Sequence, residues 1–549
     1  MHMNSFVVRI MVIMLALTGF ASPEASGQDH PFDFNLALKP VEIPELPGVH
    51  SYAYGQHDGK WLIIGGRIDG LHARRPFESF PASHNNTSIF VIDIANRKFK
   101  SASLESLSTG MREQLQSTNL NFHQQADTLY IIGGYAYSDS LDLYVTFPNL
   151  TTVLVPEVIE AIEEGRDFAD HIKQTSNDIF AVTGGQLGRI GDTFYLVGGH
   201  RFDGRYNPAN GPSFTQTYTN SIRKFRIHNT GDVPVYLDYA EITDTVHLHR
   251  RDFNLVPNIL PDGSDGYLIS SGVFQQGVDL PFLHPVEIGS AGYNPIPDVN
   301  QYLSNYHSPK LALYDGQQDA VHMLFFGGLA QYYYSEGELV RDDLVPFVRT
   351  ISRLSRNSNG IYAEYVLPVE MPALKGTSAE FIPNKMLPSS PTGVFLLDDI
   401  PGNDIPGDDI VLGHIFGGIE SPTLNPFANS LTTTTYADPS IFEISLQRGQ
   451  GTSIRVNDEI PAEFRLLQNF PNPFNPSTGI VVELPYPAPV HIGVFDITGR
   501  RIRVITDGRM MDAGRHILHF DASGLSSGIY LYSLTSGSIH ITKKMALIR

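Results

Sequence analysis

The sequence predicts an all-β protein in two parts, a large domain built from a repeated unit and a small β-sandwich at the C-terminal end. The 549 residues include 49 Gly, 37 Pro, 25 Tyr and 32 Phe, a turn-rich and aromatic-rich mixture that favours strands. A short apolar run that ends in a glycine pair recurs between residues 41 and 446. From Ala462 onward there are 9 Lys and Arg against 6 Asp and Glu, in a chain whose net charge is −20. This change in charge predicts a domain boundary.

The overall composition excludes several classes of protein. With 38 Lys and Arg against 58 Asp and Glu, the chain lacks the basic surface that binding to nucleic acid or to an anionic membrane requires. It contains no Cys, which excludes disulfides, thiolate nucleophiles and Cys-ligated zinc. Apolar residues make up 42% of the chain and charged residues 17%, so a sizeable core is expected. We therefore predict no nucleic-acid partner and a fold held by packing alone.

Residues 1–27 have the pattern of a secretory signal peptide. A positively charged start precedes a short apolar run at residues 10–17, and small residues end at Gly27, before Gln28. The run is shorter than the roughly 20 residues that span a bilayer, and no later run reaches that length. We therefore expect an exported protein with no transmembrane segment after signal cleavage.

The repeated unit is defined by its glycine pairs. Each pair follows a strand-like apolar run, which is preceded by a strand-like stretch ending in a turn and followed by an alternating stretch. The second glycines of six such units are spaced by 68, 65, 73, 56 and 90 residues and stand at Gly66, Gly134, Gly199, Gly272, Gly328 and Gly418. The fourth unit is degenerate, since Ser271 replaces its first glycine. This pattern predicts four strands per unit, with backbone packed closely at the glycines.

A glycine pair after a hydrophobic run resembles the kelch repeat, which implies a β-propeller of four-stranded blades. The resemblance implies six blades across residues 28–446, with long insertions because the spacing exceeds the ~50 residues of a kelch unit. Seven blades is the alternative, with the pair at 184–185 as a further anchor, although it lies only 14 residues before Gly199. The chain departs from the kelch pattern in having a single Trp. Residues 156–172 have helical spacing and are expected to form a connector or a lid over the propeller mouth.

A propeller binds its ligand where loops from all blades converge at one end of the channel. The candidate side chains are those just after the glycine pairs and those that open the first strand of each unit. Planar Arg pairs with carboxylates and Tyr stacks on sugars, so this set predicts a site for an anionic or polyhydroxyl ligand. The predicted ligand-binding residues are Arg67, His123, Tyr135, His200, Arg201, Arg250, Arg251, Tyr306, His307 and Arg349.

Metal sites have weaker support in the sequence. His247 and His249 would share one face of a strand, which is half of a metal site that His284 or His322 would have to complete. Two His ligands alone do not hold structural zinc, and we predict no metal there. The acidic loop at residues 402–409 offers oxygens for Ca²⁺ or forms an ordinary hairpin turn; its candidate calcium ligands are Asp404, Asp408 and Asp409. No other cofactor is predicted.

The chain ends in five sequence blocks, at residues 466–478, 495–500, 513–516, 527–530 and 542–545. In this order, at the terminus and behind a signal peptide, they resemble the type A C-terminal sorting domain of the type IX (Por) secretion system of Bacteroidetes-like bacteria. The residues predicted to form the sorting signal are Asn469, Pro471, Asn472, Pro473, Phe474, Asn475, Pro476, Gly499, Gly514, Gly528, Lys543 and Lys544.

This second resemblance implies a small Ig-like β-sandwich at residues 462–549, joined to the propeller by a polar linker at residues 447–461. It also implies that the type IX secretion machinery in the outer membrane reads the domain as an address and usually removes it. The protein would then pass through the periplasm and be secreted or attached to the cell surface.

Two functions are compatible with the sequence. The first is an exported kelch propeller that binds a glycan or a surface protein at the mouth of its channel. The second is a secreted enzyme on the same scaffold that acts on a sugar acid or polysaccharide by general acid–base catalysis. No GxSxG, Walker, HExxH or Rossmann motif stands in a suitable context, and the absence of Cys excludes a Cys–Tyr copper centre. Because no catalytic group stands out, we favour binding.

Overall fold

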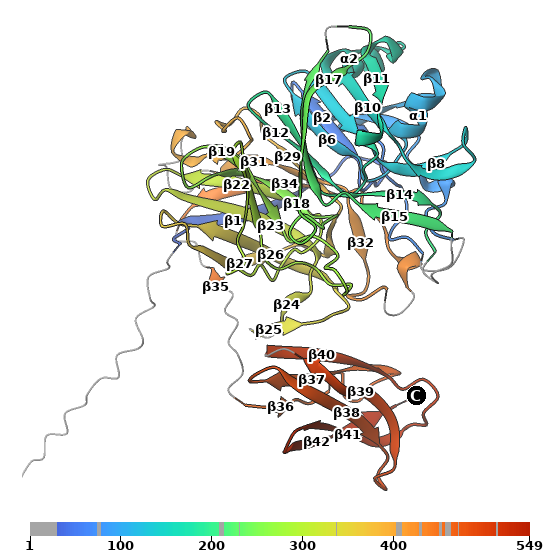
Figure 1. Ribbon diagram of the computed structural model, residues 1–549, viewed down its shortest axis with the longest axis vertical. Coiled ribbons are helices and arrows are strands. Elements are labelled where there is room, and N and C mark those ends of the chain that lie inside the picture. The colour runs from blue at the N-terminus through green and yellow to red at the C-terminus, as the bar shows by residue number, and fades with distance from the viewer. Residues whose placement is uncertain are drawn as a thin grey trace, which may run out of the picture.

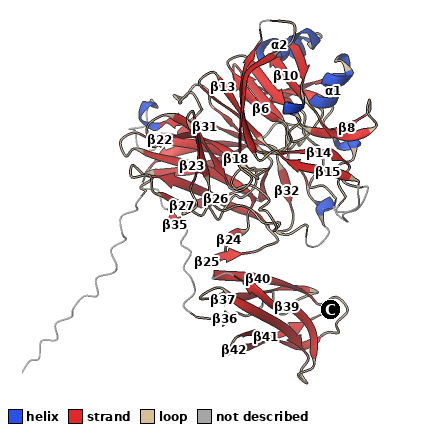
Figure 2. Cartoon of the chain, viewed as in Figure 1, coloured by secondary structure: helices blue, strands red, loops and turns tan. Residues whose placement is uncertain are grey.

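The computed structural model describes residues 30–73, 78–207, 213–229, 231–335, 338–401, 409–427, 431–449, 453–455, 463–469, 471–511 and 514–548. Strands make up most of these residues and the helices are short (Figure 2), so the predicted all-β class is confirmed. The strands form a larger body with β1 to β35 and a smaller one with β36 to β42 (Figure 1). We call the described residues from 30 to 455 the ring domain and those from 463 to 548 the C-terminal domain.

The described part of the ring domain contains six sheets that are each built on four antiparallel strands, together with smaller sheets of two or three strands. The first three consist of β2 (Ala53–His57), β3 (Lys60–Ile64), β4 (Ser88–Asp93) and β5 (Lys98–Ser103); β6 (Asn121–Gln125), β7 (Thr128–Ile132), β10 (Asn149–Leu154) and β11 (Ile172–Ser176); and β12 (Gln186–Ile190), β13 (Thr193–Val197), β16 (Ser221–His228) and β17 (Val235–Thr243).

The other three sheets repeat the same order of strands. They consist of β18 (Asn254–Ile259), β19 (Asp265–Ser270), β20 (Val286–Gly289) and β21 (Gly292–Pro295); β22 (Lys310–Asp315), β23 (Ala320–Leu329), β26 (Phe347–Arg356) and β27 (Tyr362–Glu370), flanked by β30 (Phe395–Leu396) and β35 (Ile454–Arg455); and β29 (Glu380–Pro383), β31 (Asp409–Phe416), β34 (Ile441–Arg448) and β1 (Phe34–Val41).

The sixth sheet joins the two ends of the ring domain. Its outermost strand is β1, which pairs with β34 from Phe34↔Arg448 to Val41↔Ile441. The first strands of successive sheets contact one another: β2 with β6, β6 with β12, β12 with β18, β18 with β22 and β22 with β29. The Tyr54 hydroxyl on β2 donates a hydrogen bond of 3.0 Å to the Phe381 carbonyl on β29. The six sheets therefore follow one another around a closed ring.

The glycine pairs stand near the end of the second strand of a sheet, where the segments that lead into the first strands approach. A Cβ on Gly133 would lie 1.8 Å from the carbonyl oxygen of Val182, and one on Gly66 would lie 2.4 Å from that of His50. Both glycines also have positive φ, 68° and 87° respectively. A side chain fits neither the space nor the backbone conformation, which explains why the pair recurs.

The predicted helix at residues 156–172 is shorter than expected. Helix α2 spans Val155–Glu164 and ends at Gly165, whose φ is 72°. Its buried apolar side, which includes Val158 and Ile162, contacts β2, β3, β4 and β5 of the first sheet. The other α-helix, α1 (Thr109–Leu115), precedes β6. Helix α2 takes no part in lining the pocket described below, so the lid interpretation gains no support.

The C-terminal domain consists of two sheets around one apolar core. One contains β36 (Arg465–Leu466), β37 (Ser477–Leu484) and β40 (Gly514–Asp521), and the other contains β38 (Ala488–Phe495), β39 (Arg501–Met511), β41 (Gly528–Ser536) and β42 (Ile539–Leu547). Their shared core includes Ile480, Val494, Phe520, Tyr532 and Met545. The Ig-like assignment of this domain stays a prediction.

The two domains meet at a hairpin of the ring domain, which lies between the two bodies in Figure 1. It consists of β24 (Tyr332–Ser335) and β25 (Glu338–Arg341), and β25 extends the sheet of β40. The two residues that follow the hairpin are acidic: Asp342 accepts a hydrogen bond from His519 and Asp343 accepts one from Arg509, both at 3.1 Å. The C-terminal domain is therefore tied to the ring domain by one strand pairing and two charged contacts.

The segment expected as a linker begins on the ring domain. Strand β35 lies within the predicted linker at 447–461 and pairs with β27. The hydroxyl of Ser453 accepts a hydrogen bond of 3.1 Å from Arg353, a fully buried side chain of the fifth sheet. Arg353 also donates to the carbonyl of His30 at 3.1 Å, so both ends of the ring domain meet at this side chain.

Candidate functional site

A closed ring of six backbone hydrogen bonds lies where the six sheets converge. Each amide N–H in it donates to the carbonyl of the corresponding residue before a neighbouring sheet, at distances between 2.7 and 3.4 Å. We call the six residues the floor ring: Ser51, Asn119, Gly184, Asp252, His307 and Ser378. The bonds pass from each sheet to the next and return to the first, so the floor ring requires all six sheets.

The floor residues share a position and a backbone conformation. Five of them stand two residues before the first strand of their sheet, and His307 stands three residues before β22. The five have φ between 50° and 65°, in the left-handed region. Gly, Asn and Asp adopt this region most readily, and a short polar side chain can bond locally there. Local backbone chemistry therefore places short polar side chains at the centre of the ring.

A second layer of side chains stands above the floor. The residue before a floor residue forms a β-bridge with the residue after a glycine pair, as in His50↔Arg67, Thr118↔Tyr135 and Thr183↔His200. We call these bridged positions the wall. Arg251 occupies the same position before Asp252 and bridges to Val273.

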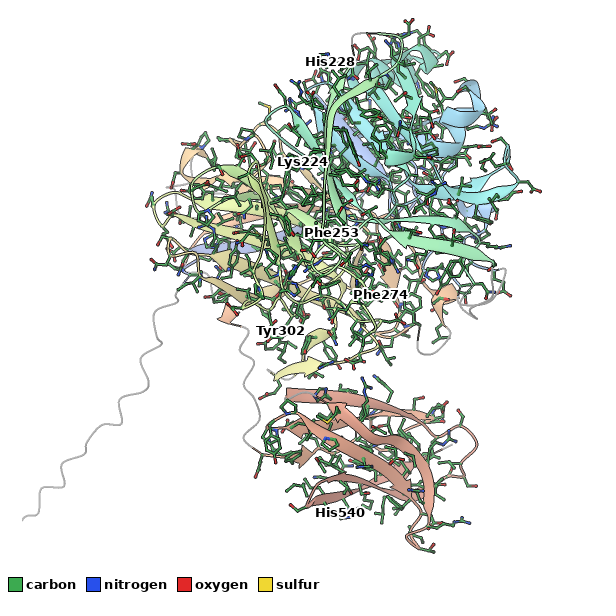
Figure 3. The ribbon with its side chains drawn as sticks, viewed as in Figure 1. Lys224, His228, Phe253, Phe274, Tyr302 and His540 are labelled. Carbon is green, nitrogen blue, oxygen red and sulfur yellow. The ribbon has the colours of Figure 1, made fainter. Side chains whose placement is uncertain are left out.

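The floor and the wall enclose a pocket of about 460 Å³, a size typical of small-molecule sites. Many of its lining residues are aromatic. The rings of His72 and Phe80 stack with centroids 4.9 Å apart and planes inclined by 29°, and Tyr206 meets His72 edge to face, also at 4.9 Å. The other aromatic lining residues are Tyr135, Phe202, Phe274, Tyr306 and Phe427. Phe274 is labelled in Figure 3, in the lower part of the larger body.

Both arginines that line the pocket are engaged with carboxylates. Arg67 is buried and forms a bidentate pair with Asp69, with N···O distances of 2.8 and 2.6 Å. Arg251 donates to Asp252, and its guanidinium lies 5.0 Å from the ring centroid of Phe274. These arginines therefore shape the pocket walls rather than offering an unpaired positive charge.

The histidines of the lining are held in defined environments. Nδ1 of His200 accepts a hydrogen bond of 2.6 Å from the Gln216 amide, which leaves the proton on Nε2. Burial, together with the nearby Arg251 charge, holds the pKa of His200 well below its usual value. Burial also lowers the pKa of His50. Both imidazoles are therefore neutral near pH 7.

His307, which belongs to the floor ring, has a different environment. Its Nε2 lies 3.0 Å from a carboxylate oxygen of Glu380 and 3.0 Å from Nζ of Lys310. Burial raises the pKa of Glu380, but the charge of Lys310 and the contacts with Lys310 and His307 outweigh it, and the pKa of the carboxyl is lowered overall. Glu380 is therefore ionised, and it fixes the orientation of the imidazole.

Six of the ten predicted ligand-binding residues line this one pocket. They are Arg67, Tyr135, His200, Arg251, Tyr306 and His307. They come from segments next to five of the six sheets, so the fold brings together side chains that are far apart in the sequence. Their role in binding stays a prediction.

The other four predicted residues lie elsewhere. His123 packs edge to face on Phe194, and Arg201 pairs with Asp203 at 2.6 Å on the surface. Arg349 donates to the carbonyl of Met371 at 2.8 Å. Arg250 is fully buried and donates to three carbonyls, those of His247, Ser271 and His284. Arg250 points away from the pocket that its neighbour Arg251 lines, because adjacent residues of extended chain face opposite ways.

The sequence prediction missed most of the floor and part of the aromatic lining. Asn119 and Ser378 carry a usable signal, a short polar residue two positions before a first strand. His123 was chosen as the residue that opens its unit, but it lies inside β6, four residues beyond the floor position. His72, Tyr206 and Phe427 come from long loops and have no positional signal.

The predicted metal residues do not form a cluster. Within the described ranges, no group of three or more His, Asp or Glu side chains is placed to hold a metal ion. His247 and His249 lie in a turn rather than a strand, so their expected shared face is wrong. His247 bonds Asp244 at 2.9 Å, whereas His249 stacks on Tyr218 at 3.9 Å.

The candidate calcium loop is only partly described. Asp404 and Asp408 lie outside the described residues. Asp409 accepts hydrogen bonds from Lys39 and Gln447, which stabilises the edge of the sixth sheet. The calcium site stays a prediction.

The predicted sorting residues divide into buried anchors and an exposed strip. Asn469 is buried and its amide donates to the Pro471 carbonyl and the Thr478 hydroxyl, at 3.1 and 3.0 Å. Phe474 is buried in the core of the domain. The exposed residues between and after these anchors are Pro471, Asn472, Pro473, Asn475 and Pro476. This segment is therefore fastened at two points and presents its other side chains to solvent.

The remaining sorting residues lie on turns and strands of the same domain. Gly499 and Gly514 have positive φ, Gly528 begins β41, and Lys544 is exposed on β42 next to Lys543.

The comparisons with known proteins identify the C-terminal domain. Residues 468–548 match the family of secretion system C-terminal sorting domains. The chain therefore carries a type IX secretion C-terminal sorting domain, which points to export out of the cell and to interaction with the type IX machinery.

A solved structure shows a distant likeness to much of the chain. One solved structure, that of YjhT, is 11% identical; the match covers 74% of this chain and 98% of that chain, with a TM-score of 0.38. A likeness at that level carries no argument about fold or function. No curated protein matches the chain. In the described ranges no helix has both the length and the apolar character to cross a bilayer, and the predicted signal peptide at residues 1–27 lies outside those ranges.

Proposed function

We propose that the ring domain is a six-bladed, kelch-like β-propeller. The floor ring supports this reading, because six backbone hydrogen bonds return to their starting residue after one turn. The glycine pair at 184–185 supplies a floor residue to the third sheet, so it does not support a seventh blade. Pairing of β1 with β34 is the closure expected when the N-terminal strand completes the last blade.

We further propose that the protein is an exported, secreted or surface-bound propeller that binds a glycan in the pocket over the floor ring. The observation that carries this proposal is the combination of many aromatic rings with the short polar side chains of the floor in the lining of one cavity. Aromatic faces cover the C–H surface of a sugar ring, while hydroxyl and amide groups bond its hydroxyls. A site of this kind needs neither a metal nor a cofactor.

The binding proposal is tested on the purified protein with a panel of immobilised bacterial, algal and plant polysaccharides. We expect retention on at least one of them, and about tenfold weaker retention for Tyr206→Leu, which removes a ring that meets His72. The matched control is Tyr239→Leu, since Tyr239 is exposed on the outer strand β17. Equal retention of both variants would place the binding surface outside the pocket.

A surface protein is the alternative ligand. Leu344, Leu424 and Tyr436 are exposed apolar side chains at the pocket: Leu344 lines it, Leu424 is close in the chain to Phe427, and the strand of Tyr436 pairs with that of Ile419. An apolar rim of this kind favours a macromolecular partner. Failure of every polysaccharide to bind, together with capture of a surface protein that depends on Leu344, would favour this ligand.

An enzyme on the same scaffold is the second candidate function. One observation favours it: the His307 imidazole lines the pocket and is oriented by Glu380, an arrangement that general bases use. Product release is followed in the same polysaccharide samples. Release that is abolished by His307→Gln, with retention unchanged, would make the protein an enzyme; retention without product would leave it a binding protein.

Export through the type IX system has its own test. Removing residues 464–549 should leave the protein in the periplasm. Normal appearance of the truncated protein outside the cell would contradict the assignment of the C-terminal domain as the export signal.

A further inference from the structure

The charges around the pocket discriminate between neutral and acidic sugars. Resting on the proposed glycan binding, we infer that the pocket selects neutral sugars and rejects sugars that carry a carboxylate. The sequence alone leaves an anionic ligand open because it places several arginines near the channel. The structure shows how those arginines are used.

Neither lining arginine has its charge available for an acidic ligand. All three nitrogens of the Arg67 guanidinium donate within the protein: Nε and Nη2 donate to Asp69, and Nη1 donates to Asn85 at 3.0 Å. Arg251 donates to Asp252 and, at 3.2 Å, to the Tyr218 hydroxyl. An acidic ligand would therefore have to compete with Asp69 and Asp252 for these positive charges.

Carboxylates, in contrast, outnumber arginines in the lining. Asp252, Asp279 and Asp343 line the pocket, against Arg67 and Arg251. Asp252 projects over the floor, because its Oδ1 lies 2.9 Å from the point that a Cβ of Gly184 would occupy. Asp343 is paired with Arg341 at 2.8 Å. Asp279 lines the pocket, is exposed, and has neither a hydrogen bond nor an ion pair with any residue in the described part of the chain, so no cation of the protein is paired with its charge.

The histidines add no positive charge near pH 7. His50 and His200 are both buried in the lining, and burial holds the pKa of each below its usual value. What they offer instead is neutral donors and acceptors. Nε2–H of His200 has no acceptor among the described residues and is available to a ligand hydroxyl or carbonyl oxygen.

The remaining polar lining suits hydroxyl groups. Ser51, Asn119 and Ser378 belong to the floor, and Thr118 and Thr183 to the wall. Ser and Thr hydroxyls both donate and accept, as do the hydroxyls of a sugar, whereas a carboxylate only accepts. A neutral polyhydroxyl ligand can therefore satisfy this lining without bringing a like charge close to Asp252 and Asp279.

The test uses matched pairs of probes on the purified protein. Neutral oligosaccharides of glucose, galactose and mannose are compared with oligomers of the corresponding uronic acids, which differ by one carboxylate per ring. We expect the neutral member of the retained pair to bind at least about tenfold more tightly at low salt, and the difference to shrink as salt screens the carboxylates.

Asp279→Asn identifies the source of the discrimination. This variant should narrow the preference for the neutral probe by about threefold, because it removes the uncompensated charge. Asp58→Asn is the control, since Asp58 is an exposed carboxylate in the turn after the far end of β2. If the preference for the neutral probe narrowed equally in both variants, it would come from net charge and the inference would be overturned.

The outcomes separate the inference from the function on which it rests. Tighter binding of a uronic acid oligomer than of its neutral partner would overturn the inference and leave glycan binding in place. Retention of neither member of any pair would overturn the proposed glycan binding, and the inference with it.

Discussion

The ring domain and the C-terminal domain use glycine for different purposes. In the ring domain a Cβ on Gly133 would lie 1.8 Å from the backbone of the segment that enters the third sheet. In the C-terminal domain Gly499 and Gly514 also have positive φ, but nothing lies within 4 Å of the place a Cβ would take. The repeated glycines of the ring domain therefore reflect packing between sheets, whereas Gly499 and Gly514 reflect backbone conformation alone.

The two domains also differ in where their recognisable residues lie. The glycine pairs of the ring domain are buried, and they serve only the packing of the fold. The sorting segment at residues 471–476 is largely exposed and fastened by Asn469 and Phe474. Exposed side chains that the core does not require are available to a partner, which agrees with an address read by the secretion machinery.

The largest expected effect concerns ring closure. Removing residues 30–41 deletes β1, which pairs with β34 over eight residues, and with it the buried Phe32 and Phe34. We expect the ring domain to lose its cooperative unfolding transition, because the sixth sheet loses its outer strand. Trp61 is the single Trp of the chain and is buried in β3, so its fluorescence reports on the ring domain alone.

The control deletion lies in the other domain. Removing residues 539–548 deletes β42 and should leave the Trp61 transition unchanged. If the unfolding midpoint measured by Trp61 fluorescence did not change after loss of residues 30–41, closure of the ring by β1 would be contradicted.

The next effect compares one glycine from each domain. Gly133→Ala should lower the free energy of unfolding of the ring domain by more than about 3 kcal/mol, because the new Cβ meets the Val182 carbonyl. Gly499→Ala should lower that of the C-terminal domain by about 1 kcal/mol, through the positive φ alone. Trp61 fluorescence during denaturation measures the first and circular dichroism the second. Equal losses would show that packing does not distinguish the two glycines.

A smaller effect follows from acidification. Burial, helped by the charges of Arg189 and Lys385, lowers the pKa of His123 to about 4. In the unfolded chain the same imidazole has a pKa of about 6.5, so between pH 6.5 and 4 the unfolded state binds more protons than the folded state. The ring domain should therefore lose stability as the pH falls, by about 2 kcal/mol at pH 5 from this residue.

The variant His123→Gln measures that contribution. Between pH 7 and pH 5, the midpoint of its unfolding transition, followed by Trp61 fluorescence, should fall less than that of the unmodified protein. Parallel pH profiles for the two proteins would show that His123 is not kept neutral by the fold.

The smallest effect concerns the contact between the domains. Arg509 and Asp343 form an ion pair of 3.1 Å in which the Arg side chain is 58% exposed. Exposed pairs contribute about 1 kcal/mol or less, so Arg509→Ala should shift the unfolding of the C-terminal domain only slightly. Arg503→Ala is the control on the same strand, β39, without that partner. A loss above about 2 kcal/mol would mean that the C-terminal domain depends on the ring domain for its stability.

The sequence predicted those features that depend on local backbone geometry. The glycine pairs and the blocks of the sorting domain are short patterns whose cause lies within a few residues. The floor ring has only a weak local pattern, a glycine or short polar residue two positions before a first strand, because the hydrogen bonds that define it run between sheets and its side chains range from Gly184 to His307. Arg250 and Arg251 show the limit most clearly: one lies in the core and the other lines the pocket, and the sequence does not say which.

Some aromatic residues of the pocket could not be predicted from the sequence, for a different reason. His72, Tyr206 and Phe427 come from three loops that are far apart in the sequence and meet only after the ring has closed. Loop length does not determine where a loop passes, so residue type was the only clue, and aromatic residues are common throughout this chain.

The most direct test of glycan binding over the floor ring is a crystal structure of the protein with an oligosaccharide that it retains. The account predicts a sugar ring against His72 and Tyr206, with its hydroxyls bonded to Asn119, Ser378 and Nε2 of His200. Electron density for the oligosaccharide on an outer strand, with the pocket filled by water, would contradict it.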